Sequence, residues 1–196
     1  MEFQIVTGRQ FQQHINAVAA LRISIFKEYP YLYDGNIQTE TDYLTSFSKS
    51  KNSVLIMVKD DEKVIGAVTG IPLAEAGEKF LIPFATNQPV DSIFYLGEIL
   101  LLKDYRGKGI GYQLYKMFED WVRKKQQYQT IAIVEVIRDQ HDPRKPKHYT
   151  PVHKLWEKLG YVEHPEMAIQ ASYKEVDSDG KIPHSLVYSF KDLSTL

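Results

Sequence analysis

The sequence predicts a single α/β (α+β) domain, in which a mixed sheet of about six to seven strands carries helices on both faces. Three observations predict this fold class. An apolar hairpin occupies residues 54–71, two strand-then-helix units follow it at 93–124 and 130–159, and a last apolar strand, LVYSF, lies near the end. Antiparallel strands followed by strand–helix units are typical of a sheet covered on two sides. A chain of 196 residues fits one domain over residues 1–196.

The N-terminal part is predicted to hold one short strand and two helices. Residues 3–6 form the strand, and apolar residues recur at helical spacing over 10–29. Arg22 falls in phase with that apolar face. Proline and glycine in YPYLYDGN end the pattern, and a weaker helix is predicted over 41–47.

The remaining elements follow from periodicity and turn residues. Residues 54–58 and 63–71 are the two strands of the hairpin, and residues 74–91 are predicted to be an irregular insertion with one short helix. A strand is predicted over 93–102. A second strand is predicted over 130–136, and because this segment is nearly all apolar, it is expected at the centre of the sheet. The helix after Gly109 has a continuous apolar stripe, expected of a helix packed on a sheet: Ile110, Leu114, Met117, Phe118, Trp121 and Val122.

Composition excludes several classes of protein. The absence of cysteine excludes a disulfide framework, a zinc site built from cysteines and a thiol nucleophile. A formal net charge of −1 gives no basic footprint for nucleic acid. No apolar run approaches the ~20 residues that cross a bilayer, and the first residues do not read as a signal peptide. We therefore expect a soluble, cytoplasmic protein without nucleic-acid or membrane partners.

The stretch RGKGIG, residues 106–111, lies where an apolar strand gives way to an amphipathic helix. A dinucleotide-binding turn would need a third glycine where Tyr112 stands, and a P-loop would need Ser or Thr after Lys108. A tight turn without a ligand is one remaining interpretation, and an anion site is the other. Gly109 and Gly111 are costly in a helix by ~1 kcal/mol each relative to Ala, but they let an anion approach the unpaired N–H groups of its first turn. With Arg106 and Lys108 beside them, they indicate a pyrophosphate cradle.

Two motifs resemble one known family. Arg106-x-x-Gly109-x-Gly111, after an apolar strand, resembles the Q/R-x-x-G-x-G/A signature of the GNAT superfamily of acetyl-CoA-dependent N-acetyltransferases. KLWEKLGY, residues 154–161, is similar to the later "lYeklGF" element of that family, and the spacing between the two also agrees. The motifs together span residues 94–161, and the hairpin and N-terminal helices are compatible with the fold.

The resemblance implies acetyl-CoA as co-substrate, without a metal, and transfer of acetyl to a primary amine of a small molecule or peptide by direct attack in a ternary complex. The pyrophosphate is expected on main-chain amides of the glycine turn, and the pantetheine arm along the edge of the preceding strand, where pairing uses backbone and not side chains. The residues that this assigns to acetyl-CoA are Leu100, Leu101, Leu102, Arg106, Gly107, Lys108, Gly109, Ile110 and Gly111. A homodimer is compatible with the resemblance.

For proton transfer, Glu98 is the first candidate base, because it stands alone in an apolar strand. The alternatives are a solvated strand end or a core pair with Arg22, and Glu135 is a second carboxylate in an apolar strand. The position of the family's usual acid, a tyrosine, holds Trp156, whose indole N–H is no acid near neutral pH. Tyr149 is therefore the candidate acid.

Two histidines, His141 and His148, are alternatives to that tyrosine, and orientation of the reactants alone is a further one. The tryptophan also leaves open a non-catalytic acyl-CoA-binding sensor or regulatory protein of the same fold. A nucleotide-binding module of another fold is a weaker third reading. The proline-rich loop 139–151 is either a lid or a rigid surface loop.

The acceptor is expected between the N-terminal helices and the central strands, as in similar enzymes. Tyr31 and Tyr33 are candidate acceptor-binding residues, since they could stack an apolar group or surround an ammonium. A tyrosine cluster that simply covers a loop is the alternative. Arg22 either faces the acceptor or pairs with a carboxylate in the fold.

Overall fold

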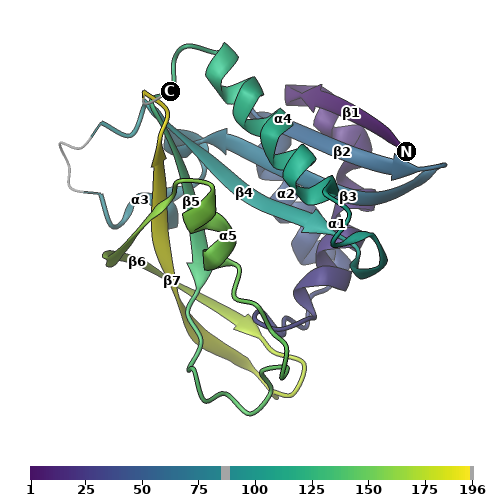
Figure 1. Cartoon of the computed structure of the whole chain (residues 1–196), viewed down its shortest axis with the longest axis vertical. Helices are drawn as coiled ribbons and strands as arrows, with labels where there is room; N and C mark the ends of the chain where they lie inside the picture. Colours follow the sequence, from purple (N-terminus) through teal and green to yellow (C-terminus); the bar gives the residue numbers. More distant parts are fainter. Residues whose placement is uncertain (85–88, 195–196) are drawn as a thin grey trace.

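The computed structural model describes residues 1–84 and 89–194. Its strands join into one seven-stranded sheet in the order β1-β2-β3-β4-β5-β7-β6 (Figure 1). Neighbouring strands are antiparallel, except for β4 and β5, which are parallel. The strands are β1 (Glu2–Thr7), β2 (Val54–Asp60), β3 (Lys63–Pro72), β4 (Ile93–Leu101), β5 (Thr130–Val136), β6 (Val162–Lys174) and β7 (Lys181–Asp192). The predicted mixed sheet in a single domain is confirmed.

Helices cover both faces of the sheet, as predicted (Figure 1). The pair α1 and α2 packs on one face, and α4 and α5 pack on the other. The helices are α1 (Ile15–Phe26), α2 (Ile37–Lys49), α3 (Glu78–Leu81), α4 (Ile110–Lys124) and α5 (His153–Lys158), with 3-10 turns η1 (Gly8–His14), η2 (Leu73–Glu75) and η3 (Lys103–Tyr105). None of the helices in the described part of the chain has the length and apolar character needed to span a membrane.

The apolar stripe of α4 is buried as its spacing predicts. Ile110, Leu114, Phe118 and Val122 face the sheet and are at most 4% exposed. This packing holds the first turn of the helix at the end of β4, and with it the glycine turn.

The N-terminal helices differ from the sequence prediction in their bounds. The segment predicted as one helix over 10–29 is a 3-10 turn followed by the shorter α1, which ends where the chain folds back and the Tyr33 N–H bonds the Phe26 carbonyl at 2.8 Å. In turn, α2 is longer than predicted, because the Asn36 side chain caps it by accepting from the Thr39 N–H at 3.0 Å. The insertion predicted at 74–91 holds the short helix α3, and its residues 85–88 lie outside the described residues.

The parallel strands β4 and β5 separate soon after they start (Figure 1). In the described chain they pair only at Ile93–Tyr95 with Thr130–Ala132. A bulge at Gly97 shifts the register of β4 against β3, and a Cβ there would lie 2.8 Å from the Thr69 hydroxyl. Only glycine fits this position. The edge of β4 on the β5 side is therefore unpaired from Leu96 onward.

Candidate functional site

The turn between β4 and α4 presents unpaired main-chain donors. The first bond of the helix runs from the Gln113 N–H to the Gly109 carbonyl at 3.0 Å. Among the described residues, no acceptor bonds the N–H groups of residues 109–112. The start of a helix also carries partial positive charge. The predicted anion cradle therefore has the donors that it needs.

The three glycines of the turn occupy their positions for different structural reasons. Gly107 and Gly109 adopt φ of +75° and +79°, which L side chains rarely adopt. Gly111 is helical, and a Cβ on it would make only an ordinary contact of 3.8 Å with the Leu101 side chain. Neither backbone nor internal packing requires glycine there. The missing Cβ leaves the donor-lined surface at residues 109–112 open to a group that approaches from outside.

Both basic side chains of the motif are held by neighbours. The Arg106 guanidinium bonds the Glu28 carboxylate at 2.8 and 3.1 Å, and its Nε donates to the Leu101 carbonyl at 2.9 Å. The Lys108 ammonium donates to the Asp104 carbonyl at 2.9 Å. The pair with Glu28 joins the turn to the loop that follows α1.

The outer end of the predicted pantetheine edge, 100–102, is partly occupied. The Leu101 carbonyl accepts from Arg106, whereas the Leu102 N–H points to the other side, to the Ile65 carbonyl of β3 at 2.9 Å. Leu102 also lies past the end of β4. The free edge therefore lies nearer the bulge, over residues 96–100.

Glu98 and Arg22 adopt the core pair that the sequence left open as an alternative. Glu98 is 6% exposed, and its carboxylate accepts from Arg22 and, at 2.7 Å, from the Thr69 hydroxyl. Arg22 also pairs with Glu40 and lies over the Tyr43 ring, 4.3 Å from its centroid. Neither Glu98 nor Arg22 lines the cavities described below. Both carboxylate oxygens of Glu98 are engaged, which favours a structural role for this glutamate.

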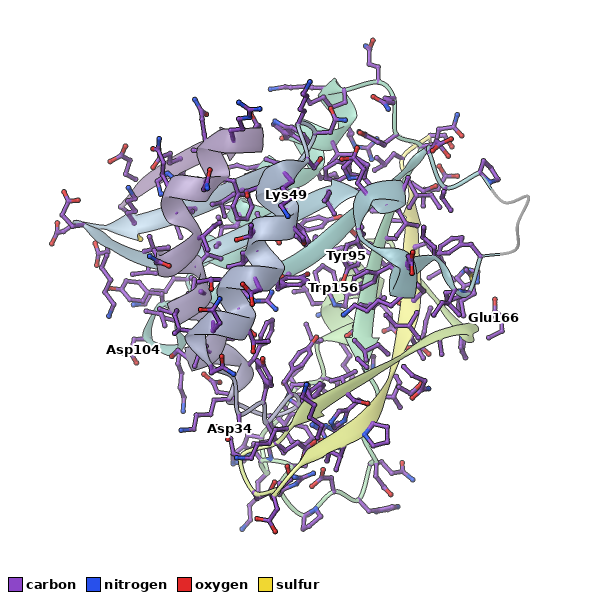
Figure 2. The ribbon with its side chains drawn as sticks, turned by 180° about the vertical axis from the view of Figure 1, so that it is seen from behind. Asp34, Lys49, Tyr95, Asp104, Trp156 and Glu166 are labelled. Atoms are coloured by element: carbon purple, nitrogen blue, oxygen red, sulfur yellow. The ribbon has the colours of Figure 1, made fainter. Side chains whose placement is uncertain are left out.

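Two adjoining cavities lie at the far end of β5. The first, about 310 Å³ in volume, lies between the loop after α1, the end of β5 and the segment before α5; its walls include Tyr29, Tyr31, Glu135, Arg138 and Tyr149. The second, about 270 Å³, lies beneath α5 and is lined by Glu135, His153, Trp156, Glu157, Tyr161, Glu163 and Ser189. From the side of α1 and α2, Trp156 is seen between β4 and β5 (Figure 2).

Glu135 is common to both cavities and is half-buried. Burial, together with the negative charges of Glu163 and Glu157, raises the pKa of Glu135 to about 7. A carboxyl group with this pKa can take up and release a proton near neutral pH. The sequence indicated this residue only through its place in an apolar strand, since its two acidic neighbours come from α5 and β6.

The predicted tyrosines are divided between the cavity and the core. Tyr149 packs edge-on against Tyr29, with ring centroids 4.7 Å apart, and burial raises the pKa of its phenol. Tyr31 lines the same cavity and packs on Phe26. Tyr33 instead packs against Tyr173 at 5.5 Å and lies outside both cavities.

The two histidines that were alternatives to Tyr149 do not reach the cavities. His141 and His148 are exposed and line neither of them. Trp156 is 5% exposed, and its ring packs edge-on against Tyr161 at 5.3 Å. Among the candidates that the sequence offered, Tyr149 is therefore the one placed beside Glu135.

The loop over residues 139–151 is fastened to the rest of the fold. Glu175, which is 1% exposed, forms ion pairs with both Arg138 and Arg144. Arg138 also donates to the Tyr31 carbonyl at 2.7 Å, and Arg144 pairs with Asp177 at 3.0 Å. These bonds favour the rigid-loop interpretation over a lid. Sequence reasoning missed Glu175, because no local pattern shows that one carboxylate serves two arginines from a distant loop.

Comparison with known proteins agrees with this geometry. The profile of the Acetyltransferase (GNAT) family matches residues 19–161, whereas none of the curated proteins matches the chain. A ribosomal-protein-alanine N-acetyltransferase from Brucella melitensis is similar in structure, with a TM-score of 0.62 and 11% identity over 98% of this chain and 100% of that chain. The loading GNATL domain of CurA from Lyngbya majuscula is similar with a TM-score of 0.63 and 11% identity over 100% of both chains. An N-acetyltransferase from Staphylococcus aureus Mu50 is similar with a TM-score of 0.60 and 15% identity over 98% of this chain and 99% of that chain.

At these identities, the structural likenesses show the fold. The profile match carries the family, because it spans more than half of the chain and includes the glycine turn and the LGY segment before β6. The chain therefore belongs to the GNAT family of acetyltransferases.

Proposed function

We propose that this protein transfers an acetyl group from acetyl-CoA to a primary amine of a small molecule or peptide, by direct attack in a ternary complex. One observation carries the proposal: the unpaired edge of β4, residues 96–100, extends back from the donors of the glycine turn. Such an edge pairs with an extended, amide-bearing chain as a further strand would. A pantetheine arm is such a chain, and a diphosphate suits the donors at residues 109–112.

The fit to acetyl-CoA rests on this chain's own residues. The N–H groups of residues 109–112 would bind the diphosphate, and the missing side chain of Gly111 gives it room. Arg106 and Lys108 would add positive charge beside it. When bound, acetyl-CoA supplies an activated thioester, and the protein orients the amine toward it, which contributes much of the rate in such reactions.

Proton transfer is assigned to the two groups that share the first cavity. Glu135 takes the proton from the acceptor ammonium, and its pKa of about 7 suits that task near neutral pH. The amine nitrogen then forms a bond to the acetyl carbon as the carbon–sulfur bond breaks. The leaving thiolate takes a proton from Tyr149, and the second proton that the nitrogen loses returns to the Tyr149 phenolate through solvent. Tyr149, whose raised pKa keeps its phenol protonated, is the donor within this cavity. Glu98 is less suited to act as the base, because Arg22 and Thr69 engage its carboxylate.

A second candidate function is an acyl-CoA-binding sensor that does not catalyse transfer. Trp156 favours it, because this side chain stands where similar enzymes have a tyrosine and cannot donate a proton. The cradle would be retained in such a protein, whereas turnover would be absent.

Two measurements test the proposal. Calorimetric titration should give binding of acetyl-CoA and none of ATP or NAD. Release of free thiol from acetyl-CoA should then exceed background hydrolysis with at least one member of a panel of primary amines. Binding without thiol release on any amine would favour the sensor, and absence of acetyl-CoA binding would overturn both functions.

A further inference from the structure

The cavity beneath α5 is lined by three glutamates and by no lysine or arginine. Sheet register explains how two of them come together. Glu163 of β6 lies opposite Ser189 of β7, which lies opposite Ile133 of β5. Glu135 is two residues beyond Ile133 and so points to the same face. Helix α5 covers this face and adds Glu157.

These three carboxylates have no cationic partner of their own. Among the described residues, none of them takes part in a salt bridge. The glutamates that are buried elsewhere in the described chain are paired, as Glu98 is with Arg22 and Glu175 with Arg138. In this cavity Glu135 is half-buried, whereas Glu157 and Glu163 are exposed. The cavity therefore holds negative charge that the fold itself does not neutralise.

Two nearly buried polar groups on the same cavity also have no partner. Ser189 is 3% exposed and Trp156 is 5% exposed, and both line the cavity. Among the described residues, neither the Ser189 hydroxyl nor the Trp156 indole N–H makes a hydrogen bond. Neither of these two atoms is among the fully buried unpaired polar atoms of the described chain, so both are open to the cavity. Independently of the carboxylates, the Ser189 hydroxyl can accept a hydrogen bond from a ligand in this cavity.

The charge and the walls indicate the class of ligand. No group of three metal-ligating side chains is arranged to hold a metal ion in the described chain, and about 270 Å³ is far more space than one ion needs. Aromatic faces beside carboxylates suit an ammonium group, and Trp156 and Tyr161 supply such faces. An organic cation fits these walls better than a metal ion.

We propose that this cavity is a subsite for the distal ammonium of an acceptor with two or more amino groups, a diamine or polyamine. The inference rests on the proposed function, since the reacting amine occupies the adjoining cavity. The two cavities share Glu135, His153 and Glu163, so one linear molecule can extend from one into the other. Glu163 and Glu157 hold the distal ammonium while Glu135 faces the reacting amine.

The first test compares acceptors that differ only in the distal charge. Butylamine, 1,4-diaminobutane and spermidine are assayed with the unaltered protein and with the double variant Glu157→Gln/Glu163→Gln. Both side chains are exposed, so the variant should fold. We expect kcat/KM to fall about 10-fold or more for the two polyamines, because each loses two partly exposed ion pairs with the protein. For butylamine, which has no distal ammonium, kcat/KM should fall at most about 3-fold. The difference should shrink at high salt, which screens such pairs.

Glu166→Gln is the matched control. It removes one carboxylate from the same strand, where Glu166 pairs with His164 and is exposed, at the edge of the molecule away from Trp156 (Figure 2). It should change kcat/KM less than 2-fold for all three amines. Equal losses for butylamine and spermidine in the double variant, or no loss, would overturn the subsite.

The second test separates this inference from the proposed function. Spermidine is titrated into the protein by calorimetry without acetyl-CoA. Binding that the double variant loses and Glu166→Gln keeps would support the subsite even if no amine were acetylated. Acetylation of butylamine as efficient as that of spermidine, with no spermidine binding, would remove the subsite and leave the acetyltransferase in place.

Discussion

At the scale of single residues, Glu135 shows how neighbours distant in sequence set the chemistry of one side chain. Its strand neighbours are apolar, and its charged neighbours, Glu157 and Glu163, come from α5 and β6. Like charges and burial both favour the protonated form. The result is a carboxyl group that titrates near pH 7 instead of near 4.5.

Glu135→Gln tests this assignment through pH dependence. In the unaltered protein, kcat/KM should rise with pH through about 7 as Glu135 loses its proton. The variant should lack that rise and be about 100-fold slower at pH 8, typical for the loss of a general base. Glu163→Gln serves as control, because removing a like charge should shift the rise to lower pH without abolishing it. An unchanged profile in Glu135→Gln would exclude this residue as the base.

The same variant makes a stability prediction of definite sign. Because the folded-state pKa lies above the ordinary value, the native protein binds the extra proton between pH 4.5 and about 7. The effect of Glu135 is therefore that the free energy of unfolding is highest below pH 4.5 and falls as pH rises through 7. Glu135→Gln should match the unaltered protein near pH 4.5 and exceed it at pH 8, by at most about 3 kcal/mol, in urea unfolding.

Gly111 gives a prediction in which affinity and stability move in opposite directions. Gly111→Ala should stabilise the protein by a few tenths to about 1 kcal/mol, because alanine favours a helix and its Cβ meets no atom closer than 3.8 Å. It should weaken acetyl-CoA binding about 10-fold by occupying the space above the N–H groups. Gly180→Ala, where a Cβ has no atom within 4 Å, is the control. Unchanged acetyl-CoA affinity in Gly111→Ala would show that the cradle lies elsewhere.

Glu98→Gln distinguishes a structural glutamate from a catalytic one. Removing its charge leaves Arg22 in the core with Glu40 alone, and breaking a buried pair costs about 3 kcal/mol. Glu28→Gln, at the exposed pair with Arg106, should cost less than about 1 kcal/mol. Urea denaturation measures both. A Glu98→Gln protein of normal stability with turnover lost 100-fold would instead make Glu98 the base.

At the scale of elements, one carboxylate holds two loops in place. Glu175 binds Arg138 and Arg144 of the loop after β5, and Arg138 in turn binds the Tyr31 carbonyl of the loop after α1. These two loops form a wall of the first cavity. The shape of the cavity therefore depends on a residue that does not line it.

Glu175→Gln should loosen both loops together. Arg138, which is largely covered, and Arg144, which is exposed, lose their common charge, so amide hydrogen exchange should quicken over residues 29–33 and 138–145 while β2 and β3 stay protected. In an active enzyme, KM for the amine should rise more than kcat falls. Asp177→Asn, which alters only an exposed contact of Arg144, should have a small effect. Quickened exchange in one loop alone would disprove the coupling.

Sequence patterns predicted the elements better than the contacts between them. The stripe of α4, the hairpin of β2 and β3, and the glycine turn follow from local periodicity and turn chemistry. The bounds of α1 do not, because the fold-back onto Phe26 ends it. Likewise, the place of Glu98 beside Arg22 depends on packing of β4 against α1, and the cavity at Glu135 depends on β6, β7 and α5 meeting. The spacing of residues within one element does not predict such long-range contacts.

At the scale of the whole molecule, the separation of β4 from β5 is the feature on which the proposed binding of acetyl-CoA depends. Binding to the free edge should add hydrogen bonds along residues 96–100 and at residues 109–112. Hydrogen exchange with saturating acetyl-CoA should therefore slow at these amides, with little change at Ile93–Tyr95, which already pair with β5. A ligand at 100 times its Kd should also stabilise the fold by about 2.7 kcal/mol. Slowed exchange confined to other strands would place the ligand elsewhere.

The short seam between β4 and β5 has a mechanical consequence. Strands β5, β7 and β6 pair with the rest of the sheet at the three positions Ile93–Tyr95. Their far end is tied to the loop after α1, where the Asp34 N–H donates to the Lys174 carbonyl and the Val176 N–H donates to the Leu32 carbonyl, each at 2.8 Å. From Tyr95 to Leu101 the strand extends about 20 Å at ~3.3 Å per residue. The gap that opens between β4 and β5 over that length is therefore held at both of its ends. A change in the width of the opening therefore requires the loop after α1 to move together with the paired positions at Ile93–Tyr95.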